Sequence, residues 1–517
     1  MRKDVILHWM RFAAVMLLFA PTIVSCDLED NPVDPGGYVP EKKGKTIMLV
    51  SDIHVMAPEL LESKGEAYTK YLSIDPKLLE YSADVLNNLV AEALRQKPDL
   101  VIIPGDLTKD GELVSHQLVA NTLKQLRSAG IPVVVVPGNH DIDNPDAKYF
   151  SGAETRYAAR TSTAQFATIY NDFGYATAFA RDDASLSYAC EPLAGLVLLC
   201  IDSNMYEENK FKEKGDERDF CTVAGRIREK TMTWMLDQAD KARANKKQVV
   251  VVEHHGIVEH FDGQAKLQGE YVLKDNVNVV KQMMEHGIHL VFSGHTHLQD
   301  IAQYRISKDE KVDSLVDVAT GSTISYPNPW RKITVNDDFT EWQIGTEYVK
   351  SIPSVADVQQ TCYKRLYDNL YSGLGYYINE YWPSINDYRS KLAMFGLPEN
   401  FLPATAEETS HLLISNLGAE LCRIYMIHNE GNEGKNPQST ALAENVKNIA
   451  QEVVTKRLKE LGKTDAEITV ILRVLLAAYD HYVGNSLNSV LTDTNQLTDA
   501  AMKSVTDDLN VVLKIGK

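Results

Sequence analysis

Short apolar runs alternate with longer amphipathic stretches from about residue 46 to residue 348. The runs are rich in β-branched residues and are bounded by polar residues, Gly or Pro, which predicts strands buried on both faces. The stretches 78–94, 118–126 and 232–244 have apolar residues at helical spacing. The apolar runs are Ile47–Val50, Leu100–Ile103, Val133–Val136, Leu196–Ile201, Val249–Val252 and Leu290–Phe292. This alternation predicts a layered α/β domain.

The pattern changes after residue 350, where Ser351-Ile352-Pro353 interrupts it and strand-like runs cease. Apolar residues then recur at helical spacing, as in Val355, Val358, Cys362, Leu366 and Leu370, and again in Leu442, Val446, Ile449 and Val453. Gly462 is a candidate C-cap, and Thr464-Asp465-Ala466-Glu467 has the pattern of a capping box. Residues 351–517 are therefore predicted to form a separate helical domain, with 428–437 as a loop between two helices.

The N-terminus has the pattern of an export signal rather than of a folded element. Arg2 and Lys3 precede the apolar stretch 12–19, which is too short to span a membrane. The ending Ile23-Val24-Ser25-Cys26 resembles a bacterial lipobox, which implies removal of residues 1–25 and a lipid on Cys26. Residues 26–45 are acidic and rich in Pro and Gly, which predicts a tether. We therefore expect an exported lipoprotein of the cell envelope, anchored in the outer membrane, with periplasmic and cell-surface locations both open.

Composition and charge narrow the classes of function. Of the 517 residues, 44% are hydrophobic and 24% are charged, which is typical of a globular protein. The formal net charge of −18 argues against binding to a nucleic-acid polymer, which needs a surface rich in Lys and Arg. Five cysteines follow Cys26, an odd number without CxxC spacing, so no disulfide framework is predicted.

Five polar clusters, each directly after an apolar run, carry the candidate chemistry. They are Asp52-Ile53-His54, Gly105-Asp106, Gly138-Asn139-His140-Asp141, His254-His255 and Gly294-His295-Thr296-His297. Side chains at the carboxyl ends of strands gather in α/β folds, and residues two apart on a strand point to the same side. Together the clusters supply three aspartates, one asparagine and six imidazoles. This inventory is sufficient for two divalent metals and predicts a phosphoester hydrolase.

The order D-x-H, G-D, G-N-H-D, H-H, G-H-x-H resembles that of the calcineurin-like metallophosphoesterases. With the helical pattern that follows, the resemblance implies a four-layer α/β/β/α sandwich over residues 46–350 and a C-terminal all-helical domain. It also implies that a hydroxide between two metals attacks phosphorus in line. The implied first metal is held by Asp52, His54 and His297, the second by Asn139, His254 and His295, and Asp106 bridges both.

Two further residues have roles implied by the same resemblance. His140 is the candidate general acid, or a cation facing the phosphoryl group, and Asp141 is expected to orient it. The alternative for His140 is a histidine that only supports the ligands. Relatives carry proline two residues after the ligand histidine of the fourth motif, where this chain has Gly256. The motif alignment favours His254 as the ligand, with His255 as a packed neighbour.

Departures from other members of the family narrow the expected reaction. Purple acid phosphatases carry tyrosine where this chain has Lys109, and both Ser/Thr protein phosphatases and periplasmic nucleotidases have glutamate at Asp141. The remaining resemblance is to bacterial class III cyclic-nucleotide phosphodiesterases and their lipoprotein relatives. It implies a phosphodiesterase for a small phosphoester, with cyclic nucleotides among the candidates. The alternatives are a phosphomonoesterase or nucleotidase that scavenges phosphate, and a non-catalytic surface binding protein.

Two expectations about cofactors and partners follow. The oxygen and imidazole ligands suit two divalent metal ions, of which the resemblance favours Mn²⁺, with Fe²⁺ and Zn²⁺ as alternatives. The expected partners are a small phosphoester and, through the lipid on Cys26, the membrane. Nothing in the sequence of the helical domain identifies a protein partner.

Overall fold

The computed structural model describes residues 44–516, except 262, 309–310, 381, 383–395, 481–484, 493–501 and 505–506. The predicted signal peptide, Cys26 and nearly all of the predicted tether lie outside the described residues. Among the helices that are described, none is both long and apolar enough to cross a membrane. All five cysteines after Cys26 are buried and unpaired with one another.

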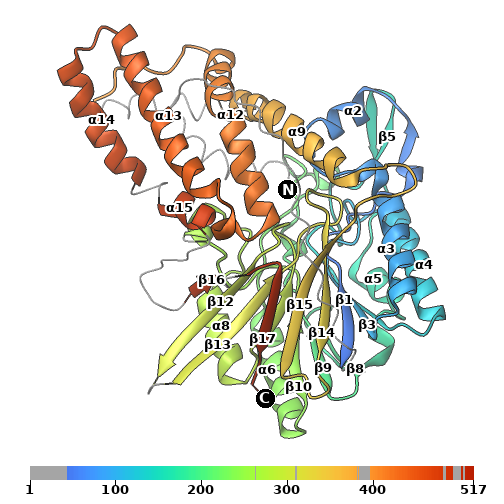
Figure 1. Ribbon diagram of the computed structural model, residues 1–517. Helices are drawn as coiled ribbons and strands as arrows, with labels where there is room; N and C mark the ends of the chain where they lie inside the picture. The colour runs from blue at the N-terminus through green and yellow to red at the C-terminus, as the bar shows by residue number, and fades with distance from the viewer. Residues whose placement is uncertain are drawn as a thin grey trace.

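Two large sheets form the body of the molecule (Figure 1). The first has the strand order β17-β15-β14-β1-β3-β4, and the second has the order β16-β12-β13-β11-β10-β9-β8-β7. The first sheet consists of β1 (Lys45–Leu49), β3 (Leu100–Pro104), β4 (Val133–Val136), β14 (Pro329–Val335), β15 (Glu341–Tyr348) and β17 (Asn510–Lys514). The second consists of β7 (Ala178–Arg181), β8 (Tyr188–Leu193), β9 (Leu196–Cys200), β10 (Gln248–Val252), β11 (Leu290–Ser293), β12 (Ile301–Lys308), β13 (Lys311–Ala319) and β16 (Met502–Ser504). Each predicted apolar run therefore coincides with a strand.

Smaller elements complete the body of the molecule. A three-stranded sheet is formed by β2 (Leu61–Ser63), β5 (Lys148–Ser151) and β6 (Glu154–Tyr157). The helices of the body are α2 (Glu66–Leu72), α3 (Ser82–Gln96), α4 (Leu113–Ser128), α5 (Thr163–Ile169), α6 (Glu229–Ala244), α7 (Gln264–Leu267) and α8 (Asn276–Glu285).

Alternating burial along the strands shows how the layers pack. In β9, Leu198 belongs to the core between the two sheets, whereas its neighbours Val197 and Leu199 pack in a second core with Met235 of α6 and Met283 of α8. Helices α3 and α4 lie on the side of the first sheet (Figure 1). Both faces of the central strands β3, β4, β9, β10 and β11 are thus covered, which explains why these strands are continuous apolar runs. The predicted α/β/β/α arrangement is confirmed.

The helical region stands above one end of the sandwich (Figure 1). Its helices are α9 (Val358–Glu380), α12 (Ala406–Glu430), α13 (Ser439–Glu460), α14 (Asp465–Tyr479) and α15 (Asn485–Thr492). The region has a core of its own, which includes Leu417, Val446 and Leu475. The predicted capping box is present at the start of α14, where Thr464 and Glu467 satisfy each other's backbone N–H groups.

The end of the chain departs from the predicted all-helical segment 351–517. Strand β17 pairs antiparallel with β15, and β16 pairs antiparallel with β12, so the last residues return to the sandwich. Within β17, Leu513 is buried while Val512 is 54% exposed, as expected of an edge strand that covers a core on one face. The helical prediction holds from α9 to α15, but the residues after α15 form strands instead. The sequence pattern did not indicate β16 and β17, because both strands pair with partners far earlier in the chain.

Candidate metal centre

The predicted ligands lie on the loops that follow five strands. Strands β1, β3 and β4 are adjacent and parallel in one sheet, and β10 and β11 are adjacent and parallel in the other. Their carboxyl ends therefore meet at one end of the sandwich. The ligands come from β1 (Asp52, His54), β3 (Asp106), β4 (Asn139), β10 (His254) and β11 (His295, His297).

The backbone of these loops is bent in an unusual way. Asp52, His54, Asp106, His295 and His297 all have positive φ, between 37° and 66°. A non-glycine residue in this region costs on the order of 1–3 kcal/mol and persists only where the surrounding structure holds it. Neighbouring loops supply that support, since His54 N donates to the Asp106 carbonyl at 2.9 Å and His295 N donates to the Asp52 carboxylate at 3.1 Å. Strain repeated at five candidate ligands is typical of a functional site.

Asp52, His54 and His297 form the first group of converging ligand atoms. His54 Nε2 and His297 Nε2 are 3.1 Å apart, and His297 Nε2 is 3.3 Å from Asp52 Oδ1. All three residues are at most 9% exposed. The structure thus brings together the residues predicted for the first metal, while their role as ligands stays a prediction.

Asp106, His254 and His295 form the second group, with Asn139 beside them. His254 Nε2 is 3.4 Å from Asp106 Oδ2, 3.2 Å from His295 Nδ1 and 3.0 Å from Asn139 Oδ1. The glycine of the Gly105-Asp106 cluster is needed for this packing, because a Cβ there would lie 2.5 Å from His254 Nδ1. These are the residues predicted for the second metal and for the bridge.

The Asp106 carboxylate joins the two groups. Its Oδ1 accepts a hydrogen bond from His140 N at 2.9 Å. Its Oδ2 lies 3.5 Å from His54 Nε2 and 3.4 Å from His254 Nε2, is buried, and has no hydrogen-bond partner among the described residues. A buried carboxylate oxygen without a donor is costly unless a cation satisfies it. The donor set therefore fits two divalent metals that share Asp106.

The electrostatics favour the metal-binding protonation states of His54, His295 and Asp106. Burial lowers the pKa of His54 and His295 well below the usual value, so both imidazoles are neutral. Burial works to raise the pKa of Asp106, but His254, His140 and His54 outweigh it and hold that pKa well below its usual range. Burial also opposes a charge on His254, yet Asp106 raises its pKa to about 9, so a metal that binds this ring displaces a proton.

His140 has a different carboxylate partner from the one predicted. Its Nδ1 is 2.9 Å from Asp110 Oδ1 and 2.7 Å from the Lys109 carbonyl. Asp141, predicted to orient His140, instead accepts hydrogen bonds from the backbone N–H groups of Leu107, Thr108 and Gly138 at 2.9–3.0 Å. In the structure Asp110, and not Asp141, contacts the His140 ring, whereas Asp141 ties the second and third loops together. The catalytic roles of His140 and Asp141 stay predictions.

The two adjacent histidines of the fourth cluster point to different surroundings. His254 faces Asp106 and Asn139, as described above. The ring of His255 instead lies 2.8 Å from Ser203 Oγ and 3.1 Å from the Val223 carbonyl, through Nδ1 and Nε2 respectively. Both ring nitrogens of His255 are thereby engaged, which is the arrangement expected of a packed neighbour of the ligands.

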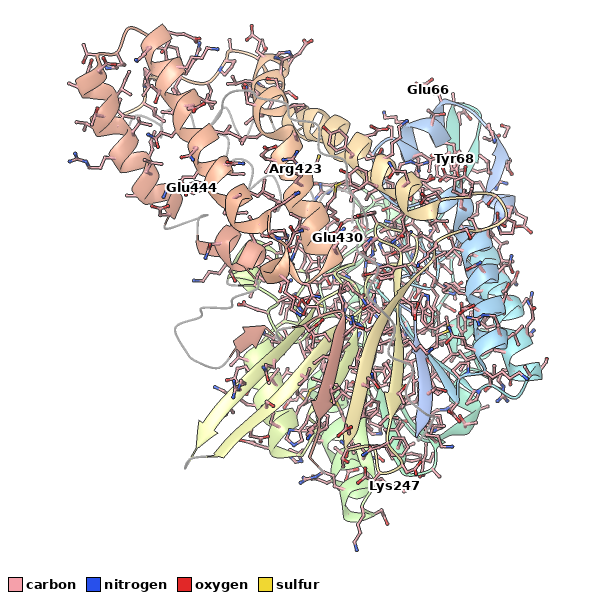
Figure 2. All side chains as sticks on the ribbon, in the orientation of Figure 1. Glu66, Tyr68, Lys247, Arg423, Glu430 and Glu444 are labelled. Carbon is pink, nitrogen blue, oxygen red and sulfur yellow. The ribbon has the colours of Figure 1, made fainter. Side chains whose placement is uncertain are left out.

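The helical region borders the site through the loop between β13 and β14. Ser322 Oγ in this loop donates to the Asp52 carbonyl at 2.7 Å, and Tyr326 OH donates to Glu430 Oε1 at 2.5 Å. Glu430 ends α12 at the point where this helix reaches the sandwich (Figure 2). One loop thus contacts both a candidate metal ligand and the helical region.

Comparison with known proteins agrees with this geometry. Residues 45–299 match the family model described as calcineurin-like phosphoesterase. The match covers just under half of the chain. A probable glycerophosphodiester phosphodiesterase GpdQ from Arcobacter nitrofigilis is 37% identical over 97 residues, which cover 18% of this chain and 29% of the relative. Glycerophosphodiester phosphodiesterase GpdQ from Enterobacter lignolyticus is 25% identical over 226 residues, 43% of this chain and 64% of the relative. The chain thus spans less than two thirds of either relative.

Solved structures of similar proteins were also found. A dimetal phosphatase from Danio rerio has a TM-score of 0.42 and 13% identity, covering 59% of this chain and 96% of that one. Purple acid phosphatase PPD1 from yellow lupin has a TM-score of 0.35 and 12% identity, covering 61% of this chain and 53% of that one.

Proposed function

We propose that this protein is a phosphoesterase that uses two divalent metals and prefers phosphodiesters. The observation that carries the proposal is the Asp106 Oδ2 atom, buried without a hydrogen-bond donor between His54 Nε2 and His254 Nε2. It supports a site that shares one carboxylate between two metals. The match of residues 45–299 to the calcineurin-like phosphoesterase family model supports the same reaction class.

Each residue of the site has a defined task in this proposal. Asp52, His54 and His297 hold one metal, Asn139, His254 and His295 hold the other, and Asp106 contributes to both. When bound, the two metals polarise the phosphoryl group and lower the pKa of water. His140, whose ring centroid is 4.9 Å from that of His54, lies beside the first group and supplies a proton or a positive charge to the leaving oxygen. Asp110 keeps the His140 ring in that position.

The preference for diesters is supported by the two named relatives, which are both described as glycerophosphodiester phosphodiesterases. Each match covers less than two thirds of the relative. The identity of the two alcohol groups that are esterified to the phosphate of the substrate is therefore part of the proposal. Small phosphodiesters, including glycerophosphodiesters and cyclic nucleotides, are the compounds to screen. Mn²⁺ is the proposed metal, and Fe²⁺ and Zn²⁺ suit the same oxygen and imidazole ligands.

The test compares a diester and a monoester on one preparation. Protein beginning at Asp27 is stripped of metal, reloaded in turn with Mn²⁺, Fe²⁺ or Zn²⁺, and assayed on bis-p-nitrophenyl phosphate and p-nitrophenyl phosphate. We expect faster turnover of the diester, reduced at least about 100-fold by Asn139→Ala, because the variant removes a ligand oxygen. Asn245→Ala, at the exposed end of α6, is the matched control and keeps full activity.

Two outcomes would contradict the proposal. Faster turnover of the monoester would replace the phosphodiesterase by a phosphomonoesterase. Absence of turnover of both esters, with two metals bound per chain, would remove the proposed reaction and leave a binding protein built on a phosphoesterase fold.

A further inference from the structure

The ring of His295 is held by residues outside its own loop. Its Nδ1 lies 3.2 Å from His254 Nε2, within the second group of ligand atoms. Its Nε2 lies 3.2 Å from the Glu270 carbonyl oxygen. The Tyr271 ring stacks on the ring of His295, with 4.9 Å between the centroids and 29° between the planes. Glu270 and Tyr271 belong to none of the five sequence clusters, so the metal centre has a support that its motifs do not reveal.

The Glu270 carbonyl determines which nitrogen of His295 is available to a metal. A carbonyl oxygen only accepts hydrogen bonds, so it favours the tautomer of His295 that carries the proton on Nε2. The lone pair is then on Nδ1, the nitrogen that faces His254. Histidines that bind metals commonly donate their other N–H to a carbonyl in this way. The stacked ring of Tyr271 adds a contact that opposes rotation of the His295 ring out of this orientation.

His254 receives the same kind of support from a different part of the molecule. Its Nδ1 lies 2.9 Å from the Pro104 carbonyl oxygen, at the end of β3 in the first sheet. The carbonyl that supports His295 is instead in the segment from Gly256 to Leu273, between β10 and α8. The ends of this segment are joined, because Leu273 N donates to the Gly256 carbonyl at 2.9 Å. The position of its interior depends on other contacts.

The helical region supplies one of those contacts. Phe261 is 4% exposed and packs in the core of the helical region, where its ring lies edge-on to that of His428 in α12, with 5.5 Å between the centroids. Gln264 N donates to the Phe261 carbonyl at 3.2 Å. Gln268 N donates to the Gln264 carbonyl at 2.6 Å, and Tyr271 N donates to the Gln268 carbonyl at 2.8 Å. A series of backbone hydrogen bonds thus leads from the helical core to the ring stacked on the candidate ligand.

We propose that Tyr271, with the Glu270 carbonyl, positions the His295 ring for the second metal. The helical region keeps the supporting segment in place through Phe261. The inference rests on the proposed two-metal function, and it adds to that function a positioning residue and a task for the helical region. Without the stacked ring, the His295 side chain has more freedom to rotate, so more entropy is lost when a metal fixes it. Tyr271 therefore acts on the second metal, whose ligand group contains His295.

The experiment measures metal binding directly. Metal-free protein that begins at Asp27 is titrated with Mn²⁺ by calorimetry, which gives a dissociation constant for each of the two metals. Asn139→Ala removes a ligand oxygen of the second metal and so identifies its constant. Tyr271→Leu removes the stacked ring, whereas Tyr271→Phe keeps it. Tyr304→Leu is the matched control, because Tyr304 is 4% exposed but packs in the second core, with Met235. Tm is recorded for every variant.

We expect Tyr271→Leu to weaken binding of the second metal about 10-fold to 100-fold and to leave that of the first within about two-fold. Tyr271→Phe should bind both metals as the unmodified protein does, and Tyr304→Leu should lower Tm without changing either constant. At low Mn²⁺ concentration, turnover of bis-p-nitrophenyl phosphate by Tyr271→Leu should fall, and excess Mn²⁺ should restore it. Unchanged metal binding in a folded Tyr271→Leu variant, or an equal loss in Tyr304→Leu, would show that the inference is wrong.

A second pair of variants tests the part played by the helical region. Phe261→Leu and Phe401→Leu each shorten an aromatic side chain in the same core, where Phe401 is 3% exposed. We expect both variants to lower Tm, but only Phe261→Leu to weaken binding of the second metal. Equal constants for the second metal in the two variants would exclude the helical region from the support of His295.

Failure of the proposed function gives a different result. The unmodified protein would then bind two metals and turn over neither ester. The calorimetric comparison of Tyr271→Leu with Tyr304→Leu does not depend on turnover, so it would still report whether Tyr271 positions His295.

Discussion

At the scale of single residues, the neighbours of His140 determine what this side chain can do. Its ring is held between the Asp110 carboxylate and the Lys109 carbonyl, both within 2.9 Å of Nδ1. The turn that brings Asp110 there passes through Gly111, where φ is 73° and a Cβ would lie 2.9 Å from the His140 carbonyl. A hydrogen bond at one ring nitrogen fixes both the orientation and the tautomer of an imidazole, which proton transfer requires.

Replacing Asp110 by Asn should therefore affect catalysis more than binding. The variant keeps a side chain of the same size but removes the negative charge that orients His140, so we expect kcat on the diester to fall about 10-fold to 100-fold with two metals still bound. The measurement is steady-state kinetics together with metal analysis. Asp146→Asn, at a half-exposed carboxylate, is the control and should leave kcat unchanged.

The same comparison tests the role of Asp141. Because Asp141 joins two loops through backbone N–H groups, its Asn variant should lower Tm and metal content together. A normal kcat in Asp110→Asn, with a selective loss of kcat in Asp141→Asn at unchanged Tm, would restore the original prediction for Asp141.

The candidate ligands could be predicted because their signals are local. Each cluster directly follows a strand, so the spacing of Asp52 and His54, or of His295 and His297, already places both side chains in one loop. Asp110 carries no such signal, since its approach to His140 depends on the bend at Gly111.

At the scale of elements, the last strand shows what periodicity can and cannot predict. Buried central strands such as β10 are continuous apolar runs and were predicted with the correct residues. Strand β17 has five residues with mixed burial. Its partner β15 lies before the helical region in the sequence, whereas β17 follows it. Short edge strands of this kind gain structure only from the assembled sheet.

The two faces of β17 give a matched pair of variants. Leu513 is 8% exposed and packs in the core of the sandwich, whereas Val512 is 54% exposed. Leu513→Asp places a charge in that core and should reduce the free energy of unfolding by about 3 kcal/mol. Val512→Asp should change it by no more than about 1 kcal/mol. Urea unfolding of both variants is the measurement, and equal losses would show that β17 does not cover the core.

At the scale of the whole molecule, one buried polar junction connects the sandwich, the helical region and the end of the chain. Asp508 accepts hydrogen bonds from Ile301 N at 3.0 Å and from Asn432 N at 2.8 Å, and its carbonyl accepts one from Arg331. Nearby, His260 Nδ1 lies 2.8 Å from Asp300 Oδ2, and the next residue, Phe261, packs in the core of the helical region. The three parts therefore share buried polar contacts.

The charge on His260 makes this junction sensitive to pH. Burial works to lower the pKa of His260, but Asp300 and Asp317 outweigh it and raise the pKa to about 10. Because the pKa is higher in the folded state than the usual 6.5, the stabilisation is complete below about pH 6.5 and is lost as pH rises to about 10.

His260→Gln should remove this dependence. We expect the free energy of unfolding of the unmodified protein to fall by a few kcal/mol between about pH 6.5 and pH 10, and that of the variant to fall less. Urea unfolding across this interval, on metal-free samples of both proteins, provides the comparison. Equal slopes for the two proteins would show that His260 is not charged in the folded state.

The pairing of β17 with β15 has a consequence for the order in which the molecule is completed. A ribosome, or an export channel that threads the chain from its N-terminus, delivers β15 first and then all of the helical region before β17 becomes available. Throughout that interval the N–H and C=O groups along one edge of β15 have no strand beside them, and such an edge can recruit another chain. The time needed to deliver the helical region therefore sets how long the growing protein is exposed to aggregation at this edge.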